Sequence, residues 1–361
     1  MAEVRPHELT PNKHEAISGC LLGAAVGDVL GTPFSASSWA DIARRLGSAG
    51  IRDFHPARRR PAGSITDKIQ LMLFCADGVL RAHMRGVSRG LSNPPFMIHR
   101  SLVRWLRAQR EPAREATALC RDGWLIADRR LWSRRMPDPV TVAALRATRA
   151  FSWPTDNDSQ ACGGLTRSAP CAFSDDPFET AAVAARVTHG HPVGYLSAGL
   201  FADILGRLWE RHITLAEAAR TSLARHGEEP GMQEVMPVIE RVLALHEGGI
   251  RPTAEGIARL GEGRNAAEVL AIGLWCALAA EGFEDGVIAA VNHDGDSGSA
   301  GLIAGHFLGL IHGRQAIPAR WLERLEHADL IEQVALDLVD VPQRNGFGQQ
   351  NYDDEHRYPG Y

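Results

Sequence analysis

The chain has 361 residues, of which 45% are hydrophobic and 23% are charged, so it can bury one large core or two modest ones. Its formal net charge of −4 gives no basic excess of the kind that drives general binding to nucleic acids or membrane surfaces, and we expect neither partner. Glycine, histidine and aspartate interrupt every apolar run before it reaches the roughly 20 residues that span a bilayer.

The polar first 15 residues lack the apolar core of a signal peptide, which predicts a cytoplasmic protein. The six cysteines are scattered and show no Cys-x-x-Cys spacing, so we expect buried, reduced thiols. Lysine is rare, because Lys13 and Lys68 are the only two in the chain. Lys68 is therefore unlike the many arginines that supply most of the positive charge.

Apolar residues recur every three or four positions along most of the chain, and strand-like alternation is nearly absent, which predicts an all-α protein. The predicted helices span 13–30, 38–47, 67–85, 95–109, 139–150, 176–189, 193–211, 214–226, 232–247, 266–281, 283–292, 298–312, 317–326 and 328–339. No linker or fixed repeat divides the chain, so we expect one helical domain over 1–345 and a polar, frayed C-terminal tail over 346–361. The Arg- and Trp-rich segment 100–149 is typical of a solvated helical face with aromatic anchors.

The first helix carries glycines every four residues, at positions 19, 23, 27 and 31. They share one helix face, and without side chains they allow another backbone to approach closely. Close packing without a functional role explains the glycines by themselves. Asp28 lies in the same run of small residues, and packing does not explain it, because a buried carboxylate needs a partner.

Two further segments place acids and hydroxyls at the starts of apolar helices. Thr66 and Asp67 precede one helix, where they suit helix capping and also suit binding of a divalent cation. The segment 291–301 joins two other helices and carries Asp294, Asp296 and Ser299. Its residues could cap a helix or form an oxygen-lined site for an ion or phosphate.

Together with the segments 157–167 and 188–192, these motifs resemble the ADP-ribosylglycohydrolase family over 17–338, which is most of the chain. The resemblance implies an orthogonal multi-helix bundle of the ADP-ribosylglycohydrolase type. It also implies cleavage of the glycosidic bond between ADP-ribose and an acceptor, with two magnesium or manganese ions in the cleft. An ADP-ribose-like small molecule or an ADP-ribosylated substrate is then the expected partner.

The chain departs from the family pattern at three carboxylate positions. Ser35 stands where the family has a glutamate, Lys68 stands where it has the second aspartate of Thr-Asp-Asp, and Gly298 replaces another aspartate. The residual metal ligands are Thr66, Asp67, Asp296 and Ser299, with Asp294 as an out-of-register substitute. Because a dinuclear site needs several anionic oxygens, we expect magnesium or manganese binding to be weak or absent.

Lys68 offers a replacement for one of the lost ions. Its ammonium can take a metal's place and pair with Asp67 or Asp296, which makes Asp67, Lys68 and Asp296 the candidate catalytic residues. The alternative is that Lys68 points to solvent from the first turn of its helix. The helix dipole disfavours a lysine at that end.

The ligand-binding positions of the family are better preserved. The resemblance assigns this role to Asn157, Ser159, Cys162, Gly163, Gly164 and His189. Glycines at 163 and 164 suit a loop that offers backbone N–H groups to a diphosphate. A histidine at a helix end is more often a cap than a ligand, so His189 depends on the resemblance.

Three functions remain open from the sequence. The first is a divergent, catalytically dead protein that keeps a cleft for ADP-ribose or a related nucleotide sugar. The second is an active N- or O-glycoside hydrolase that uses one metal, or Lys68 in place of a metal. The third is a purely structural role for the helical scaffold, since a fold by itself does not establish chemistry.

Overall fold

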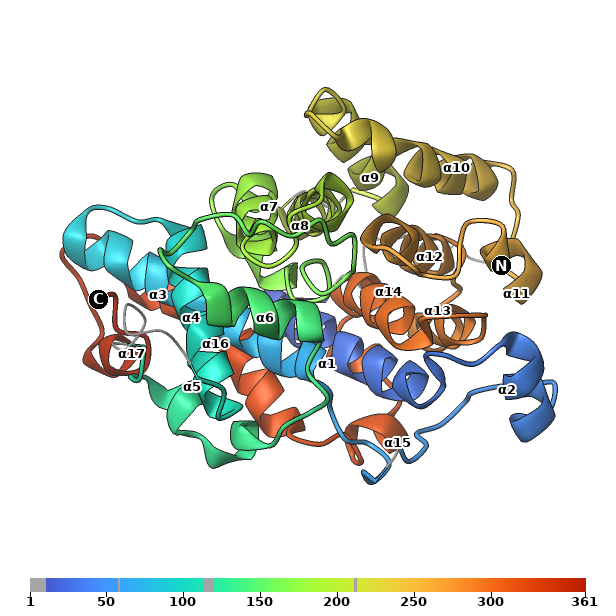
Figure 1. Ribbon diagram of the computed structural model, residues 1–361, viewed down its shortest axis with the longest axis horizontal. Helices are drawn as coiled ribbons and strands as arrows, with labels where there is room; N and C mark the ends of the chain where they lie inside the picture. The colour runs from blue at the N-terminus through green and yellow to red at the C-terminus, as the bar shows by residue number, and fades with distance from the viewer. Residues whose placement is uncertain (1–10, 58, 113–119, 211–212) are drawn as a thin grey trace, which may run out of the picture.

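The computed structural model describes residues 11–57, 59–112, 120–210 and 213–361. Throughout these ranges the chain is helical and contains no β-strand, which confirms the predicted all-α class (Figure 1). The α-helices are α1 (Lys13–Gly31), α2 (Trp39–Leu46), α3 (Asp67–Arg89), α4 (Pro94–Ala108), α5 (Trp124–Ala127), α6 (Pro139–Ala147), α7 (Pro177–Arg186), α8 (Pro192–Glu210), α9 (Leu215–His226), α10 (Met236–Glu247), α11 (Ala254–Ala258), α12 (Ala266–Leu278), α13 (Phe283–Val291), α14 (Ser297–His312), α15 (Ala319–Leu322), α16 (Ala328–Arg344) and α17 (Tyr352–Arg357). Short 3-10 helices include η2 (Thr32–Phe34) and η4 (Arg129–Trp132).

Capping side chains mark many of the helix starts. For this reason the starts predicted from the sequence lie close to the observed ones. Asn12, Thr66, Asp176 and Asn265 each accept a hydrogen bond from a backbone N–H of the first turn. The short helices α5, α11 and α17 were not predicted, because four to six residues are too few to show a periodic pattern. The end of the helix expected over 193–211 and most of the polar N-terminal segment lie outside the described residues.

Helices α1 and α14 pack backbone against backbone at the centre of the molecule (Figure 1). A side chain at Gly19, Gly23 or Gly27 would collide with the backbone of Gly309, Gly305 or Gly301, respectively. The matching four-residue spacing on both helices fixes their antiparallel register. The predicted role of the glycine face in close packing is confirmed.

The other helices surround this pair in two groups. Helices α3, α4 and α16 pack together on one side, and α8, α12 and α13 pack against or beside α14 on the other (Figure 1). The buried side chains of both groups form one continuous hydrophobic core. Segment 13–34 is long and apolar enough to cross a membrane by length and composition, but 89% of its most apolar window is buried inside the protein.

The C-terminal tail over 346–361 is docked rather than frayed, so that expectation was wrong. Asp354 of α17 is buried and accepts hydrogen bonds of 2.8 Å from Arg344 and from Asn345. The hydroxyl of Tyr358, which is fully buried, donates to Asp337 of α16 at 2.5 Å. These buried polar contacts hold the tail against the bundle.

Candidate functional site

A cavity of about 570 Å³ opens where the end of α1 meets the starts of α3 and α14. Its volume is within the range typical of small-molecule sites. The lining residues are Thr32, Pro33, Ser35, Ala36, Ser37, Ala57, Thr66, Asp67, Lys68, Leu71, Arg135, Met136, Asp138, Thr141, Ala161, Cys162, Gly163, Thr166 and Asp296. We call this cavity the cleft.

Asp28 lies beneath the cleft and is completely buried. Its carboxylate accepts hydrogen bonds from the hydroxyls of Thr66 at 2.6 Å and Thr32 at 3.0 Å. The ammonium of Lys68 lies 3.1 Å from the same carboxylate. Three donors, one directly after α1 and two at the start of α3, therefore contact the Asp28 carboxylate. Without such partners its negative charge would be costly to bury.

Lys68 points into the cleft, so the solvent-facing alternative was wrong. Its Nζ lies 3.1 Å from Asp28 Oδ1 and 4.0 Å from Asp296 Oδ1. The sequence analysis predicted Asp67 or Asp296 as the partner of Lys68. The nearer of the two paired carboxylates is that of Asp28, which was not predicted. Burial by itself lowers the pKa of Lys68, but the charges of Asp28 and Asp296 more than offset this, and the pKa is raised above its ordinary value. Lys68 is therefore a fixed cation at neutral pH.

Gly298 is part of the same arrangement. A Cβ atom at this position would lie 2.7 Å from the Thr32 hydroxyl, 2.9 Å from the Ser35 hydroxyl and 3.1 Å from Lys68 Nζ. The backbone N–H of Gly298 donates to Ser35 Oγ at 3.0 Å. Gly298 thus lies next to both Ser35 and Lys68, and the Lys68 ammonium lies close to where a side chain at position 298 would begin.

Two of the three acids that line the cleft, Asp67 and Asp296, have opposite pKa shifts. Burial raises the pKa of Asp67 to about 7, although the Lys68 charge and the backbone N–H of Asp138, 3.1 Å away, act in the other direction. Burial also acts to raise the pKa of Asp296, but the Lys68 charge and the hydrogen bonds from Ser299 outweigh it and leave the pKa below its ordinary value. Near pH 7 the cleft therefore holds a partly protonated acid and a carboxylate.

Several residues expected to bind metal ions are already engaged by protein partners. The Thr66 hydroxyl is donated to Asp28, and the Ser299 hydroxyl accepts from Cys162 Sγ at 3.4 Å. Asp294 is not a lining residue, and its carboxylate instead accepts from the backbone N–H of Trp39 at 2.5 Å. Across the described ranges, no group of three or more His, Cys, Asp or Glu side chains is arranged to hold a metal ion.

The residues expected to bind a ligand divide into two sets. Cys162 and Gly163 line the cleft, and Cys162 Sγ lies 3.7 Å from Asp296 Oδ2. Asn157, Ser159, Gly164 and His189 are not lining residues. The Asn157 side chain organises the loop instead, since its Oδ1 accepts from the backbone N–H groups of Ser159 and Gly190, each at 3.1 Å.

His189 lies beside the glycine loop. A Cβ atom on Gly163 would lie 2.9 Å from its ring, and its Nε2 lies 3.8 Å from Oδ2 of Asp138, a lining residue of the cleft. Nδ1 of His189 is 2.8 Å from the Thr188 hydroxyl. Burial, together with the nearby charge of Arg167, lowers the pKa of His189 to about 3 and keeps the imidazole neutral.

Sequence reasoning missed several polar residues of the site. Asp28 was recognised as needing a partner but was not placed in the cleft. Arg135 and Asp138 line it from the loop before α6, where Asp138 also caps that helix. No sequence motif marks these two residues, because only the tertiary fold brings their loop to the start of α3.

The chain is thus an all-α protein with an acid-lined cleft where the ends of several helices meet. The chain belongs to the ADP-ribosylglycohydrolase family, whose model matches residues 9–347. It is 26% identical over 348 residues to an uncharacterized protein from Archaeoglobus fulgidus, covering 91% of this chain and 98% of that one. It is also similar to a solved structure described as an ADP-ribosylglycohydrolase-related protein complex, with a TM-score of 0.60, 25% identity and coverage of 91% of this chain and 98% of the other.

Proposed function

We propose that the cleft binds ADP-ribose, or a closely related nucleotide sugar, without a divalent metal ion. The observation that carries the proposal is the position of the Lys68 ammonium, 3.1 Å from Asp28 and 4.0 Å from Asp296. A fixed cation thus offsets part of the negative charge that divalent ions would otherwise offset. This arrangement takes the place of the family's two metals in the proposed site.

The ligand's polar groups have defined partners in this proposal. The Lys68 ammonium has three N–H donors and uses one on Asp28, so others remain for phosphate oxygens or ribose hydroxyls. Asp296 is ionised and accepts hydrogen bonds from sugar hydroxyls. Gly163 also lines the cleft, and its lack of a side chain lets a phosphate approach the backbone closely.

The proposal is tested by calorimetric titration of ADP-ribose into metal-free protein, repeated with excess magnesium or manganese. We expect saturable binding that does not change when either ion is present, and no separate heat from the ion alone. Binding that requires a metal ion would contradict the proposal, because it would mean that the side chains of the cleft can hold a metal ion. An absence of binding under both conditions would favour a scaffold without this ligand.

The chain offers a matched control for the role of Lys68. Lys68→Met removes the ammonium in the cleft, whereas Lys13→Met removes the only other lysine, which lies over the Trp209 ring instead. We expect the first variant to weaken ADP-ribose binding by at least about tenfold, because it removes a charge-assisted hydrogen bond. The second variant should bind like the unmodified protein.

A second candidate function is metal-independent hydrolysis of an ADP-ribosyl N- or O-glycoside. The observation that favours it is the pair of unequal acids, with the pKa of Asp67 raised to about 7 and that of Asp296 lowered. Asp67 would donate its proton to the leaving group while Asp296 accepts a proton from the attacking water. The products are free ADP-ribose and the unmodified acceptor.

Hydrolysis is measured as release of ADP-ribose from an ADP-ribosylated arginine or serine peptide in the presence of a chelator. We expect the rate to fall as the pH rises above about 7, because Asp67 then loses the proton it must donate. Asp67→Asn and Asp296→Asn should each abolish turnover and leave ADP-ribose binding measurable. Binding without turnover in the unmodified protein would identify a pseudoenzyme.

A further inference from the structure

Arg135 is a lining residue of the cleft that no sequence motif marked. It belongs to the Arg- and Trp-rich segment 100–149, which was expected to be a solvated helical face. In the structure the Arg135 side chain lines the cleft and is only 8% exposed. A cation buried to this extent needs anionic partners. The partners of its guanidinium therefore indicate what the cleft can bind.

The Arg135 guanidinium is held by one carboxylate. Its Nη2 donates to Glu326 Oε1 at 2.5 Å. The other oxygen of Glu326 accepts from the backbone N–H of Ile65 at 3.0 Å, so this carboxylate is fixed at the loop that leads into α3. Nε of Arg135 is buried and has no hydrogen-bond partner among the described residues. Since a guanidinium carries five N–H donors, Arg135 can donate further hydrogen bonds to a ligand.

The loop that carries Arg135 is fixed on the other side as well. The backbone N–H of Asp138 donates to Asp67 Oδ2 at 3.1 Å. Between the two contacts Met136 has a φ of 58°, which residues other than glycine seldom adopt. Such a conformation persists only where the surrounding structure enforces it. Arg135 is therefore preorganised at the wall of the cleft, which lowers the entropy cost of binding a ligand there.

The charges of the cleft show why an anionic ligand needs more than one cation. Three acids line the cleft, namely Asp67, Asp138 and Asp296. The ammonium of Lys68 already lies 4.0 Å from one of them. A phosphate group beside Lys68 alone would face more negative than positive charge, and this repulsion would weaken its binding. Among the described lining residues, Arg135 is the other cation.

We propose that Arg135 binds a phosphate group of the ligand and so makes the cleft selective for a nucleotide diphosphate sugar over an uncharged glycoside. This inference rests on the proposed function, because it concerns the ligand of the same cleft. Guanidinium groups bind phosphate oxygens in pairs, and they are more weakly hydrated than an ammonium, which suits a buried anion site. Glu326 is not a lining residue and leaves the cleft side of Arg135 to the ligand. Lys68 and Arg135 thus offer one cation from each of two segments to a ligand with two phosphate groups.

The experiment is calorimetric titration of ADP-ribose, adenosine and inorganic pyrophosphate into the full chain at about 0.15 M salt. We expect Arg135→Gln to weaken the binding of ADP-ribose and of pyrophosphate about tenfold, because a charge-assisted hydrogen bond is lost. The affinity for adenosine should not change. Arg135→Lys keeps the charge but not the planar fork, so we expect a smaller loss. This variant decides the question if thermal unfolding shows that Arg135→Gln is not folded.

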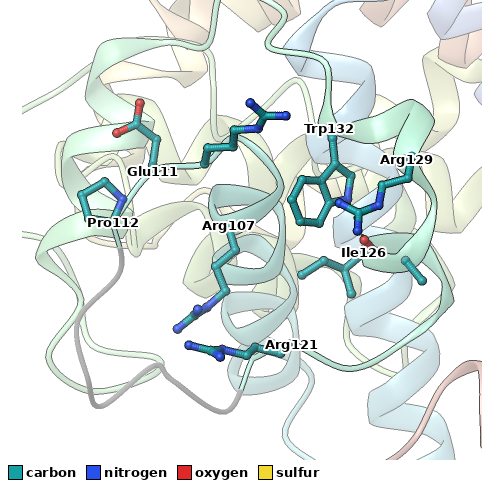
Figure 2. Close-up of a pocket in the computed structure, with 9 residues that line it drawn as sticks. Arg107, Glu111, Pro112, Arg121, Ile126, Arg129 and Trp132 are labelled. Atoms are coloured by element: carbon teal, nitrogen blue, oxygen red, sulfur yellow. Dashed lines mark hydrogen bonds between the residues drawn. The ribbon is translucent and has the colours of Figure 1, made fainter.

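Two controls separate the contact with phosphate from other effects. Arg129→Gln removes an arginine that lies over the Trp132 ring, 4.2 Å from its centre, in a cavity that shares no lining residue with the cleft (Figure 2). It should bind all three ligands like the unmodified protein. Arg135→Gln also leaves the Glu326 carboxylate without its arginine, and that charge repels phosphate. The double variant Arg135→Gln, Glu326→Gln is therefore compared with Glu326→Gln, and the tenfold loss should persist between them.

The outcomes distinguish this inference from the proposed function. Binding of ADP-ribose that is the same in Arg135→Gln would overturn the inference and leave the proposed function standing. An equal loss for adenosine would also overturn it, because Arg135 would then shape the cleft without contacting phosphate.

If the unmodified protein does not bind ADP-ribose, the proposed function fails and pyrophosphate decides on Arg135. Pyrophosphate binding that weakens in Arg135→Gln and not in Arg129→Gln would support Arg135 as an anion-binding residue. The absence of pyrophosphate binding, or an equal loss in the two variants, would overturn the inference.

Discussion

The cleft and the docked C-terminal tail differ in how their buried acids are paired. In the tail, Asp354 pairs with Arg344 at 2.8 Å and Asp337 pairs with Arg357 at 2.7 Å, so each acid has its own arginine. In the cleft, the single ammonium of Lys68 lies 3.1 Å from Asp28 and 4.0 Å from Asp296, so one cation is shared by two acids. The comparison indicates that the loss of one cation affects more buried negative charge in the cleft than in the tail.

Removing the internal cation of the cleft should give the largest effect. Lys68→Met leaves Asp28 fully buried with only the Thr32 and Thr66 hydroxyls as partners. Breaking a buried ion pair from one side costs about 3–5 kcal/mol, and we expect a loss of that size in the free energy of unfolding, measured by urea denaturation. The double variant Asp28→Asn, Lys68→Met should recover more than half of it. Equal losses in both would show that the charge of Asp28 is not the cause.

The pH dependence of stability should reveal the raised pKa of Asp67. Because the pKa of Asp67 is about 7 in the folded protein and lies near 4 when unfolded, the folded state holds one more proton between these values. Stability therefore falls as pH rises from about 4 to 7, by up to about 1.4 kcal/mol per pH unit. Asp67→Asn lacks this slope in urea denaturation at a series of pH values, and matching slopes would place the pKa of Asp67 elsewhere.

The sequence predicted those features that depend on local pattern. Helix limits followed from apolar spacing and caps, and the glycines of α1 correctly indicated a close backbone contact. The resemblance also directed attention to Asp67, Lys68 and Asp296, which line one cavity in the structure.

Features that depend on contacts between distant segments were not predicted. Asp28 becomes the nearest partner of Lys68 only because the end of α1 meets the start of α3. The C-terminal tail looked frayed because its composition is polar, but Asp337 and Arg344 pair with it. His189 lay in a motif associated with the cleft, and the structure buries its ring against Gly163 and Asp138, which line the cleft, so that His189 itself does not line it.

The glycine contacts between α1 and α14 restrict how the separation of Asp28 and Asp296 can change. Asp28 and Asp296 lie at the adjoining ends of these two helices, whose backbones touch at three glycine pairs. A slide of one helix past the other would have to cover a full turn before glycines met again. The glycine contacts therefore fix the separation of Asp28 and Asp296. We expect substitutions to replace the cation between these acids more readily than they change the separation.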